Sequence, residues 1–193
     1  MEQIAVFDFD GTLTKRDTLW LFLLFSQNRV KLAACLLLFS PLYLTYRLGA
    51  VNRHRAKEIL FSLFFRNLPS QKFDNLCKEF SKSLDGYIRA DTMNILQEHI
   101  AHGTRIIIVS ASFENWIKHW AKPYGIDVIA TQIEIGPDGL LTGKLKSPNC
   151  YGAEKVRQLE KILPDRKKYH IFAYGNSRGD REMLNYADEG KYV

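Results

Sequence analysis

Two carboxylates stand two residues apart near the amino terminus, in the segment Ile4-Ala5-Val6-Phe7-Asp8-Phe9-Asp10-Gly11-Thr12. The short apolar run before Asp8 contains Val and Phe, which is typical of a buried strand. Asp8 and Asp10 at its end would repel each other and lose solvation unless an opposite charge compensates them. A divalent cation is the usual compensation, and one carboxylate is then free to act as a nucleophile or a base. The segment therefore predicts carboxylate chemistry at the end of a strand.

Two further predicted strands end in polar residues. The run from Arg105 to Ser110 is continuous in Ile and Val, as expected of a parallel strand covered on both faces. The run from Tyr169 to Tyr174 leads into the loop Gly175-Asn-Ser-Arg-Gly-Asp180. Since ligands bind outside the carboxyl ends of parallel strands, we expect Asp8, Ser110 and this loop to surround one site.

Strands alternate with helices along most of the chain, which predicts an α/β fold with a doubly wound, mostly parallel sheet. Apolar residues at helical spacing over 56–64 and 73–84 predict two amphipathic helices between the first and second strands. We therefore expect an α/β core formed by residues 1–14 and 88–193, with an all-helical cap inserted at residues 15–87. The other expected elements are helices at 91–102, 113–122 and 153–163, a strand at 128–131 and a hairpin at 132–145.

Positive charge is concentrated in the expected cap. The chain carries a net charge of +6, and its segment 15–57 holds eight lysines and arginines against one acid, Asp17. Such a segment suits an anionic substrate, an anionic membrane surface or nucleic acid, while a solvated basic face without a partner is the alternative. The cations alternate with long apolar runs, so we expect no nucleic-acid partner.

The apolar run at 32–44 has two interpretations. Lys31 and Arg47 confine it to 15 residues, short of the ~20 that a spanning helix needs, and Pro41 is expected to break it. It could form buried helices of a small cap, or a hairpin whose apolar tip enters a membrane interface.

The cysteines and the start of the chain predict the cellular setting. Cys35, Cys77 and Cys150 are odd in number, widely spaced and in no metal-ligand pattern, which favours a reduced compartment. Because the first strand begins at Ile4, removal of a secretory signal would remove the carboxylate motif. We expect a cytoplasmic protein, with a peripheral position at the inner face of the membrane as a further expectation.

Four motifs resemble those of the haloacid dehalogenase (HAD) superfamily. Asp8-Phe-Asp10-Gly-Thr12 resembles its first motif, Val109-Ser110-Ala-Ser112-Phe113 its second, Lys155 its third, and Gly175-Asn176-Ser-Arg-Gly-Asp180 its acidic fourth. They occur in the family's order and span nearly the whole chain. The place of the insertion resembles the helical cap of the phosphoserine-phosphatase-like branch. The apolar, basic cap and the fourth motif look closer to phosphatidylglycerophosphatase C-like members.

The resemblance implies a catalytic role for three residues. Asp8 would attack phosphorus and form an aspartyl-phosphate. Asp10 would protonate the leaving oxygen and then deprotonate the hydrolytic water. Lys155 would neutralise charge on the phosphate and on Asp8.

The resemblance also implies a phosphate site and a Mg²⁺ site. Thr12, Ser110, the Ala111 amide and Lys155 would bind phosphoryl oxygens. The ligands of Mg²⁺ would come from Asp8, Asp10, Asn176 and Asp180.

The chain departs from the family's pattern at two positions. Asn176 stands where an aspartate usually ligates the metal, so we expect weaker metal binding, with Asp180 as partial compensation. Gly179 replaces an asparagine that phosphoserine phosphatases use near substrate, although Asp17 sits where their cap carries a substrate-binding glutamate.

The leading hypothesis is a Mg²⁺-dependent phosphomonoesterase for an anionic and lipid-linked ester such as phosphatidylglycerophosphate. The alternatives are a phosphatase for phosphoserine or another small metabolite, and a phosphate-binding module that has lost turnover.

Overall fold

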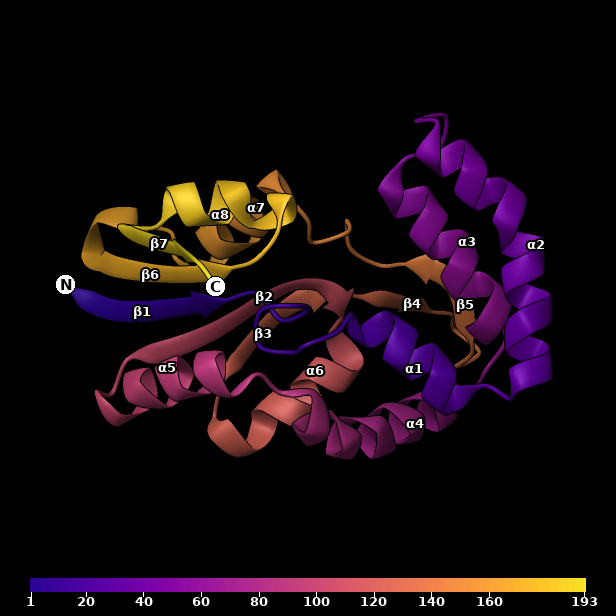
Figure 1. Ribbon diagram of the computed structural model, residues 1–193, viewed down its shortest axis with the longest axis horizontal. Coiled ribbons are helices and arrows are strands. Elements are labelled where there is room, and N and C mark those ends of the chain that lie inside the picture. Colours follow the sequence, from indigo (N-terminus) through magenta and orange to yellow (C-terminus); the bar gives the residue numbers. More distant parts are fainter.

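The computed structural model describes residues 1–193, and its centre is a five-stranded parallel sheet in the order β3-β2-β1-β6-β7 (Figure 1). The predicted parallel α/β fold is confirmed, while the edge strand β7 was not predicted. The strands are β1 (Glu2–Phe7), β2 (Arg105–Phe113), β3 (Asp127–Thr131), β6 (Tyr169–Gly175) and β7 (Glu189–Tyr192).

Helices cover both faces of the sheet, with α5 and α6 on one side and α7 and α8 on the other (Figure 1). Alternate residues of β1 point to opposite faces, so Ala5 and Phe7 join one apolar cluster while Ile4 and Val6 join another. The helices are α5 (Ala90–Ala101), α6 (Glu114–Ala121), α7 (Ala153–Ile162) and α8 (Arg181–Tyr186). Short 3₁₀ turns occupy Leu84–Tyr87, Lys122–Tyr124, Arg166–Lys168 and Arg178–Asp180.

Four helices lie between β1 and β2: α1 (Thr18–Ser26), α2 (Arg29–Arg47), α3 (Arg53–Phe65) and α4 (Ser70–Ser83). Their shared core is aromatic. The Phe22 ring lies 5.4 Å from that of Phe65, 5.2 Å from that of Phe80 and 4.7 Å from that of Trp116 on α6. These contacts join α1, α3 and α4 to α6, which covers the sheet, while α2 packs on α3.

The predicted hairpin forms but does not join the parallel sheet. Strands β4 (Ile133–Ile135) and β5 (Leu141–Leu145) pair antiparallel and pack on α3 (Figure 1). Gly143 allows the close approach, because a Cβ there would lie 2.6 Å from the Ser62 hydroxyl.

Helix α2 continues through Pro41, so the prediction that this residue breaks it was wrong. Proline lacks the N–H that would donate to the carbonyl of Leu37, four residues earlier. The Ser40 hydroxyl donates to that carbonyl instead, at 2.8 Å. The carbonyl therefore keeps a partner, and the helix reaches 19 residues.

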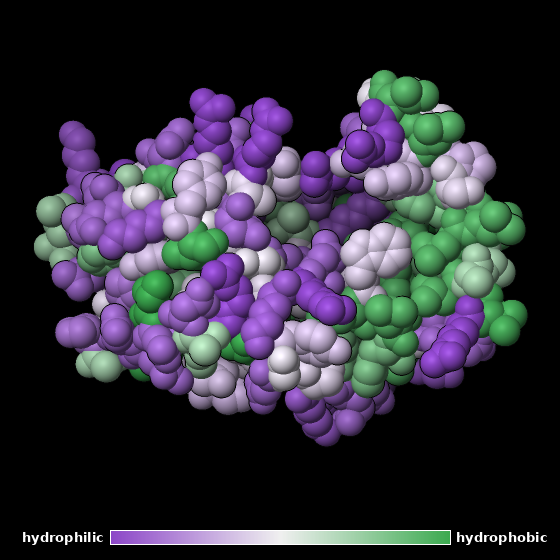
Figure 2. All heavy atoms as spheres, in the orientation of Figure 1, coloured by the Kyte–Doolittle hydropathy of each residue, from purple (hydrophilic) through white to green (hydrophobic).

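By length and composition α2 could cross a membrane, and only 11% of its apolar stretch is buried in the protein. Cys35 and Phe39 face α3 and are buried. We call the opposite side the outer face of α2. Its apolar side chains are 60–81% exposed: Val30, Leu37, Leu38, Leu44 and Leu48. Figure 2 shows apolar side chains gathered over this helix, whereas the sheet side of the molecule is mixed.

Candidate active site

The three central strands bring their polar ends together. Strand β1 pairs with β2 on one side and β6 on the other, with Phe7 opposite both Ile108 and Tyr174. Asp8 is the next residue, and its N–H donates to the Tyr174 carbonyl at 2.9 Å. Ser110 and the loop after β6 therefore flank Asp8, as the strand pattern predicted for parallel neighbours.

A buried lysine joins two acidic motifs. Lys155 Nζ lies 2.5 Å from Asp8 Oδ1 and 2.6 Å from Asp180 Oδ1, and the three side chains are almost wholly buried. Burial alone would lower the pKa of Lys155, but the two carboxylates raise it, so the lysine stays charged. Burial raises the pKa of Asp8, and the Lys155 charge opposes that rise. Lys155 is thus the protein's own counter-charge for Asp8.

Asp180 is held by its own loop. Its second carboxylate oxygen, Oδ2, accepts from the Asn176 N–H at 3.2 Å, the Ser177 N–H at 2.9 Å and the Ser177 hydroxyl at 2.8 Å. Gly175 permits this packing, because a Cβ there would lie 2.5 Å from that of Asp180. Both oxygens are therefore engaged by protein donors, and they fix Lys155 to the loop.

Asp10 points away from Lys155, toward α1. Its Oδ1 accepts from the Thr18 hydroxyl at 2.6 Å and the Thr18 N–H at 2.9 Å. Thr18 also contacts the Ser112 hydroxyl at 2.9 Å and accepts from Trp116 Nε1 at 3.0 Å. Burial, with a smaller contribution from the Asp17 charge, raises the pKa of Asp10 to about 7. A carboxyl group that titrates there suits both halves of an acid–base cycle.

Two oxygen atoms that could coordinate a cation lie close to the buried hydroxyl of Thr12. It lies 3.3 Å from Asp8 Oδ2 and 3.4 Å from Asn176 Oδ1. Gly11 leaves room for the amide, since a Cβ there would lie 2.1 Å from Asn176 Nδ2, and its φ of +80° favours glycine. No three Asp, Glu, His or Cys side chains are close enough to hold a metal by themselves. A carboxylate and an amide oxygen nevertheless fit Mg²⁺, which keeps several waters and is also held by substrate phosphate.

The loop expected to bind phosphate ends β2. The Ser110 hydroxyl is buried and accepts from the Ser112 N–H at 3.0 Å. Helix α6 begins at Glu114, one residue after its predicted start, so Ala111 lies three residues before the helix. Ser110, Ala111 and Ser112 lie near the end of β2, where its register with β3 shifts, and we call this irregular segment the Ser110 turn.

A cavity of about 250 Å³ connects Asp10 and this turn to the inserted helices. Asp17 lies at its edge, where its carboxylate caps α1 by accepting from the Trp20 N–H at 3.2 Å. The cavity also has two cations, Arg53 and Lys57. Its apolar wall consists of Leu19, Trp20, Phe39, Tyr43, Tyr46, Ala56, Leu60 and Ala111.

Gly179 is explained by packing. A Cβ at this position would lie 2.2 Å from the Tyr151 ring, and the Arg53 guanidinium lies 4.0 Å from the centroid of the same ring. Arg53, Tyr151 and Gly179 therefore form a stack from α3 to the fourth motif, which leaves no room for asparagine.

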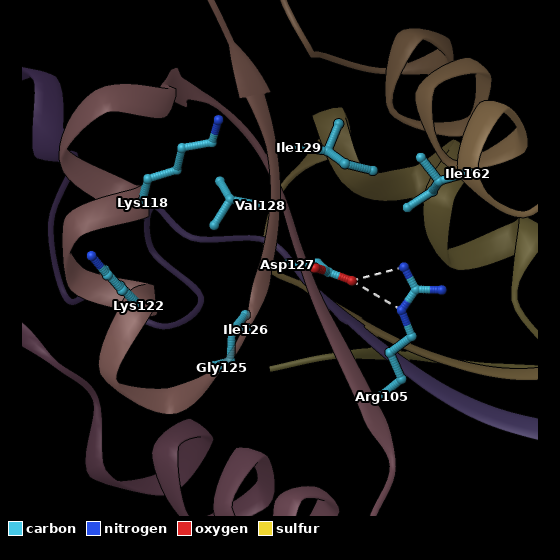
Figure 3. A pocket seen from close by; sticks show the side chains of 9 residues that line it. All are labelled: Arg105, Lys118, Lys122, Gly125, Ile126, Asp127, Val128, Ile129 and Ile162. Atoms are coloured by element: carbon cyan, nitrogen blue, oxygen red, sulfur yellow. Dashed lines mark hydrogen bonds and ion pairs between the residues drawn. The ribbon is translucent and has the colours of Figure 1, made fainter.

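A second groove, of about 570 Å³, lies at the opposite end of the sheet (Figure 3). It begins where β2 and β3 start, and Arg105 donates to Asp127 Oδ2 at 2.7 and 2.9 Å along one side. Lys118 and Lys122 line it from α6 and its extension. None of the predicted site residues lies there, so the cavity beside Asp10 is the candidate site.

The structure adds Thr18, Ser112 and Lys57 to the residues predicted from the sequence. Ser112 lies within the second motif, but it was given no role. Thr18 follows Asp17 at the start of a helix, and Lys57 lies on an amphipathic helix in which a lysine is ordinary. No sequence signal identifies Thr18 or Lys57, because their contacts with the second motif are made across 94 and 54 residues.

Comparison with known proteins agrees with this geometry. The profile of the haloacid dehalogenase-like hydrolases matches residues 5–185. Protein CicA of Caulobacter vibrioides is 30% identical over 98% of this chain and 85% of its own length. A histidinol-phosphatase of Neisseria meningitidis is 24% identical over 98% of this chain and 89% of its own length. A Bordetella pertussis protein of unknown function shares the fold, with a TM-score of 0.82, 20% identity, and coverage of 100% of this chain and 89% of its own.

Proposed function

The chain belongs to the haloacid dehalogenase-like hydrolases, and we propose that it is a Mg²⁺-dependent phosphomonoesterase that uses Asp8 as its nucleophile. The observation that carries the proposal is the buried Asp8–Lys155–Asp180 arrangement, with Asp10 turned toward the cavity from the same strand end. The Asp8 carboxylate is thus held beside the Lys155 ammonium, and the pKa of Asp10 lies near neutrality.

The residues support a two-step reaction. In the first step an Asp8 oxygen forms a bond to phosphorus while the bond to the ester oxygen breaks, and the Asp10 carboxyl gives its proton to that oxygen. In the second step the Asp10 carboxylate takes a proton from water as the water attacks phosphorus. Phosphate leaves and the Asp8 carboxylate is restored. Lys155 and the Ser110 turn stabilise the charge on the phosphoryl oxygens in both steps.

Three groups would hold Mg²⁺: the Asp8 carboxylate, the Asn176 amide oxygen and the backbone carbonyl of Asp10. When bound, the ion would offset the repulsion between the Asp8 carboxylate and an anionic phosphate. We propose that Asp180 contributes through Lys155 and the loop, since both of its oxygens already accept hydrogen bonds from them.

The Asn176→Asp variant is expected to bind Mg²⁺ about tenfold more tightly, because it adds a negative charge to the set of ligands. The check is the rise in melting temperature as Mg²⁺ is added, which reports affinity without turnover. Asn75→Asp, at an exposed position on α4, is the matched control outside the proposed site. Equal Mg²⁺ dependence in wild type and Asn176→Asp would contradict the metal assignment.

We propose that the ester is anionic and lipid-linked, with phosphatidylglycerophosphate as an example. The cavity beside Asp10 is mostly apolar but is also lined by Arg53, so it offers contacts to both a hydrocarbon portion and a second anionic group. The outer face of α2 offers apolar side chains to a bilayer interface, with Arg29 and Arg47 exposed at its two ends. An exposed apolar helix face flanked by cations is suited to contact an anionic interface. Such contact would place the protein at the inner face of the membrane.

A substrate panel tests the proposal. We expect hydrolysis of phosphatidylglycerophosphate in anionic vesicles to exceed that of phosphoserine, histidinol phosphate and aryl phosphates, and to require Mg²⁺. The double variant Leu37→Glu/Leu38→Glu is expected to lose about tenfold or more on vesicles and to retain activity on soluble esters, because these side chains are 74% and 70% exposed. Ile135→Glu changes a side chain that is 51% exposed on the hairpin and serves as the matched control.

The second candidate is a phosphatase for a small metabolite. The full-length similarity to a histidinol-phosphatase favours it, as does the Asp17 carboxylate at the cavity edge, which could accept from a substrate amine. Preference for a soluble amino ester in the panel would establish this candidate and exclude the lipid ester. Binding of phosphate without hydrolysis of any ester would instead indicate a phosphate-binding module.

A further inference from the structure

Lys57 reaches from an inserted helix to the phosphate-binding turn. It lies on α3, yet its Nζ donates to the Ala111 carbonyl and, at 3.2 Å, to Asn149 Oδ1. The same nitrogen lies 4.3 Å from the centroid of the Phe113 ring. The proposed two-step reaction does not use this lysine, although it lines the same cavity as Asp10.

The carbonyl that Lys57 contacts belongs to a tightly held peptide. The Thr131 hydroxyl also donates to the Ala111 carbonyl, at 2.8 Å. On the other side of this peptide, the Ser112 N–H donates to the Ser110 hydroxyl oxygen at 3.0 Å. The Lys57 ammonium and the Thr131 hydroxyl thus hold the Ala111 carbonyl, and the Ser112 N–H holds the Ser110 hydroxyl oxygen. A rotation of this peptide would move the Ser110 hydroxyl and the neighbouring Ala111 amide together.

We propose that Lys57 is a positioning residue that sets the orientation of the Ser110 turn and makes phosphate binding depend on the placement of the inserted helices. The inference rests on the proposed function, because it assigns the turn to phosphate. Thr131 holds the same carbonyl from the core, whereas Lys57 is the donor that comes from the insertion. Helix α3 therefore affects phosphate affinity without touching phosphate.

The charges around Lys57 make its contribution depend on pH. The groups that face it are the carboxylates of Asp10 and Asp17, the thiol of Cys150 and the guanidinium of Arg53. Burial lowers the pKa of Lys57 to about 8, and the two carboxylates oppose that fall. Above this pH the ammonium loses its charge, and its hydrogen bond to the carbonyl weakens.

The test compares Lys57→Met with Lys57→Arg, using a soluble aryl phosphate and inhibition by inorganic phosphate. We expect Lys57→Met to weaken phosphate inhibition about tenfold and to lower kcat/KM at least as much. Lys57→Arg keeps a cation and is expected to recover most of both, and its inhibition by phosphate should persist above pH 8, where that of the wild type weakens. Arg55→Met, on the same helix but exposed and paired with Glu58, is the matched control and should match wild type.

A second variant keeps the test decisive if Lys57→Met does not fold. Thr131→Val removes the other donor to the Ala111 carbonyl and is expected to weaken phosphate inhibition similarly. Phosphate inhibition of a folded Lys57→Met equal to that of wild type, or the same pH dependence of phosphate inhibition in wild type and Lys57→Arg, would overturn the inference. Absence of hydrolysis in the wild type would instead overturn the proposed function, so the two failures are distinguishable.

Discussion

Asp8→Asn is expected to reduce turnover of any phosphate ester by about 10⁴-fold or more, the scale of loss that follows removal of a nucleophile. The amide has nearly the same shape as the carboxylate but cannot form the acyl phosphate. Lys155 keeps its contact with Asp180, so we expect the variant to fold and to melt close to wild type. Steady-state hydrolysis with Mg²⁺ present, together with circular dichroism, measures both effects.

The matched control for this experiment is Asp165→Asn. Asp165 is an exposed carboxylate paired with Lys168 at 3.3 Å, far from the sheet edge that holds Asp8. It should leave activity unchanged. If Asp8→Asn retained a tenth of wild-type turnover, water rather than Asp8 would be the attacking group.

Lys155→Met has the second largest expected effect, because it acts on both activity and stability. It removes the cation between two buried carboxylates, and leaving a buried charge without its partner costs about 3–5 kcal/mol. At about 2–4 °C per kcal/mol for a chain of this size, the melting temperature should fall by about 6–20 °C. Activity should fall at least 10³-fold, because Lys155 also offsets charge on the phosphate.

The pH dependence of this variant has a definite sign. Without Lys155, the folded-state pKa of Asp8 rises further above its unfolded value, and that of Asp180 loses the charge that lowers it and rises as well. The folded protein then binds more protons than the unfolded chain, so stability falls as pH rises from about 4 to 8. In wild type the raised pKa of Lys155 contributes stability that is present below the ordinary lysine pKa and is lost only at higher pH.

Thermal unfolding at several pH values measures how the stability of Lys155→Met and that of wild type depend on pH. Lys161→Met, an exposed lysine on the same helix, is the control and should show the same pH dependence as wild type, whereas the stability of Lys155→Met should fall more steeply. A Lys155→Met protein as stable as wild type at pH 8 would mean that another group compensates the two carboxylates.

The placement of Asp8 and Ser110 at the carboxyl ends of neighbouring strands could be predicted, because it depends on local sequence pattern. Asp8 and Ser110 each follow an apolar run of strand length, and parallel strands place such ends side by side. The lysine of α7 and the loop at Asn176 could be placed only through their resemblance to family motifs. Neither residue has a spacing that by itself indicates a ligand.

The contacts between the inserted helices and the sheet could not be predicted. Asp10 turns to Thr18 of α1, and Lys57 of α3 reaches the Ala111 carbonyl, contacts that depend on how the inserted helices pack beside β2 and α6. Such packing is decided by side-chain shape rather than by periodicity. The persistence of α2 through Pro41 depends on a single hydroxyl, that of Ser40, whose rotamer no sequence pattern specifies.

Division of the chain into a core of residues 1–14 and 88–193 and a cap of residues 15–87 stays a proposal. The four helices form between β1 and β2 as expected, but the hairpin of β4 and β5 packs on α3 from the far side of the sequence boundary. Any cap motion would therefore include the hairpin as well.

The central claim is that the phosphoryl group passes through Asp8, and trapping it there is the most direct test. The enzyme is mixed with excess ester and Mg²⁺, quenched in acid during turnover, and digested for peptide mass spectrometry. We expect one phosphoryl group on the peptide that contains Asp8, labile to hydroxylamine as an acyl phosphate is, and absent from Asp8→Asn. Turnover without any phosphoryl group on that peptide, or with the group on another residue, would contradict the mechanism.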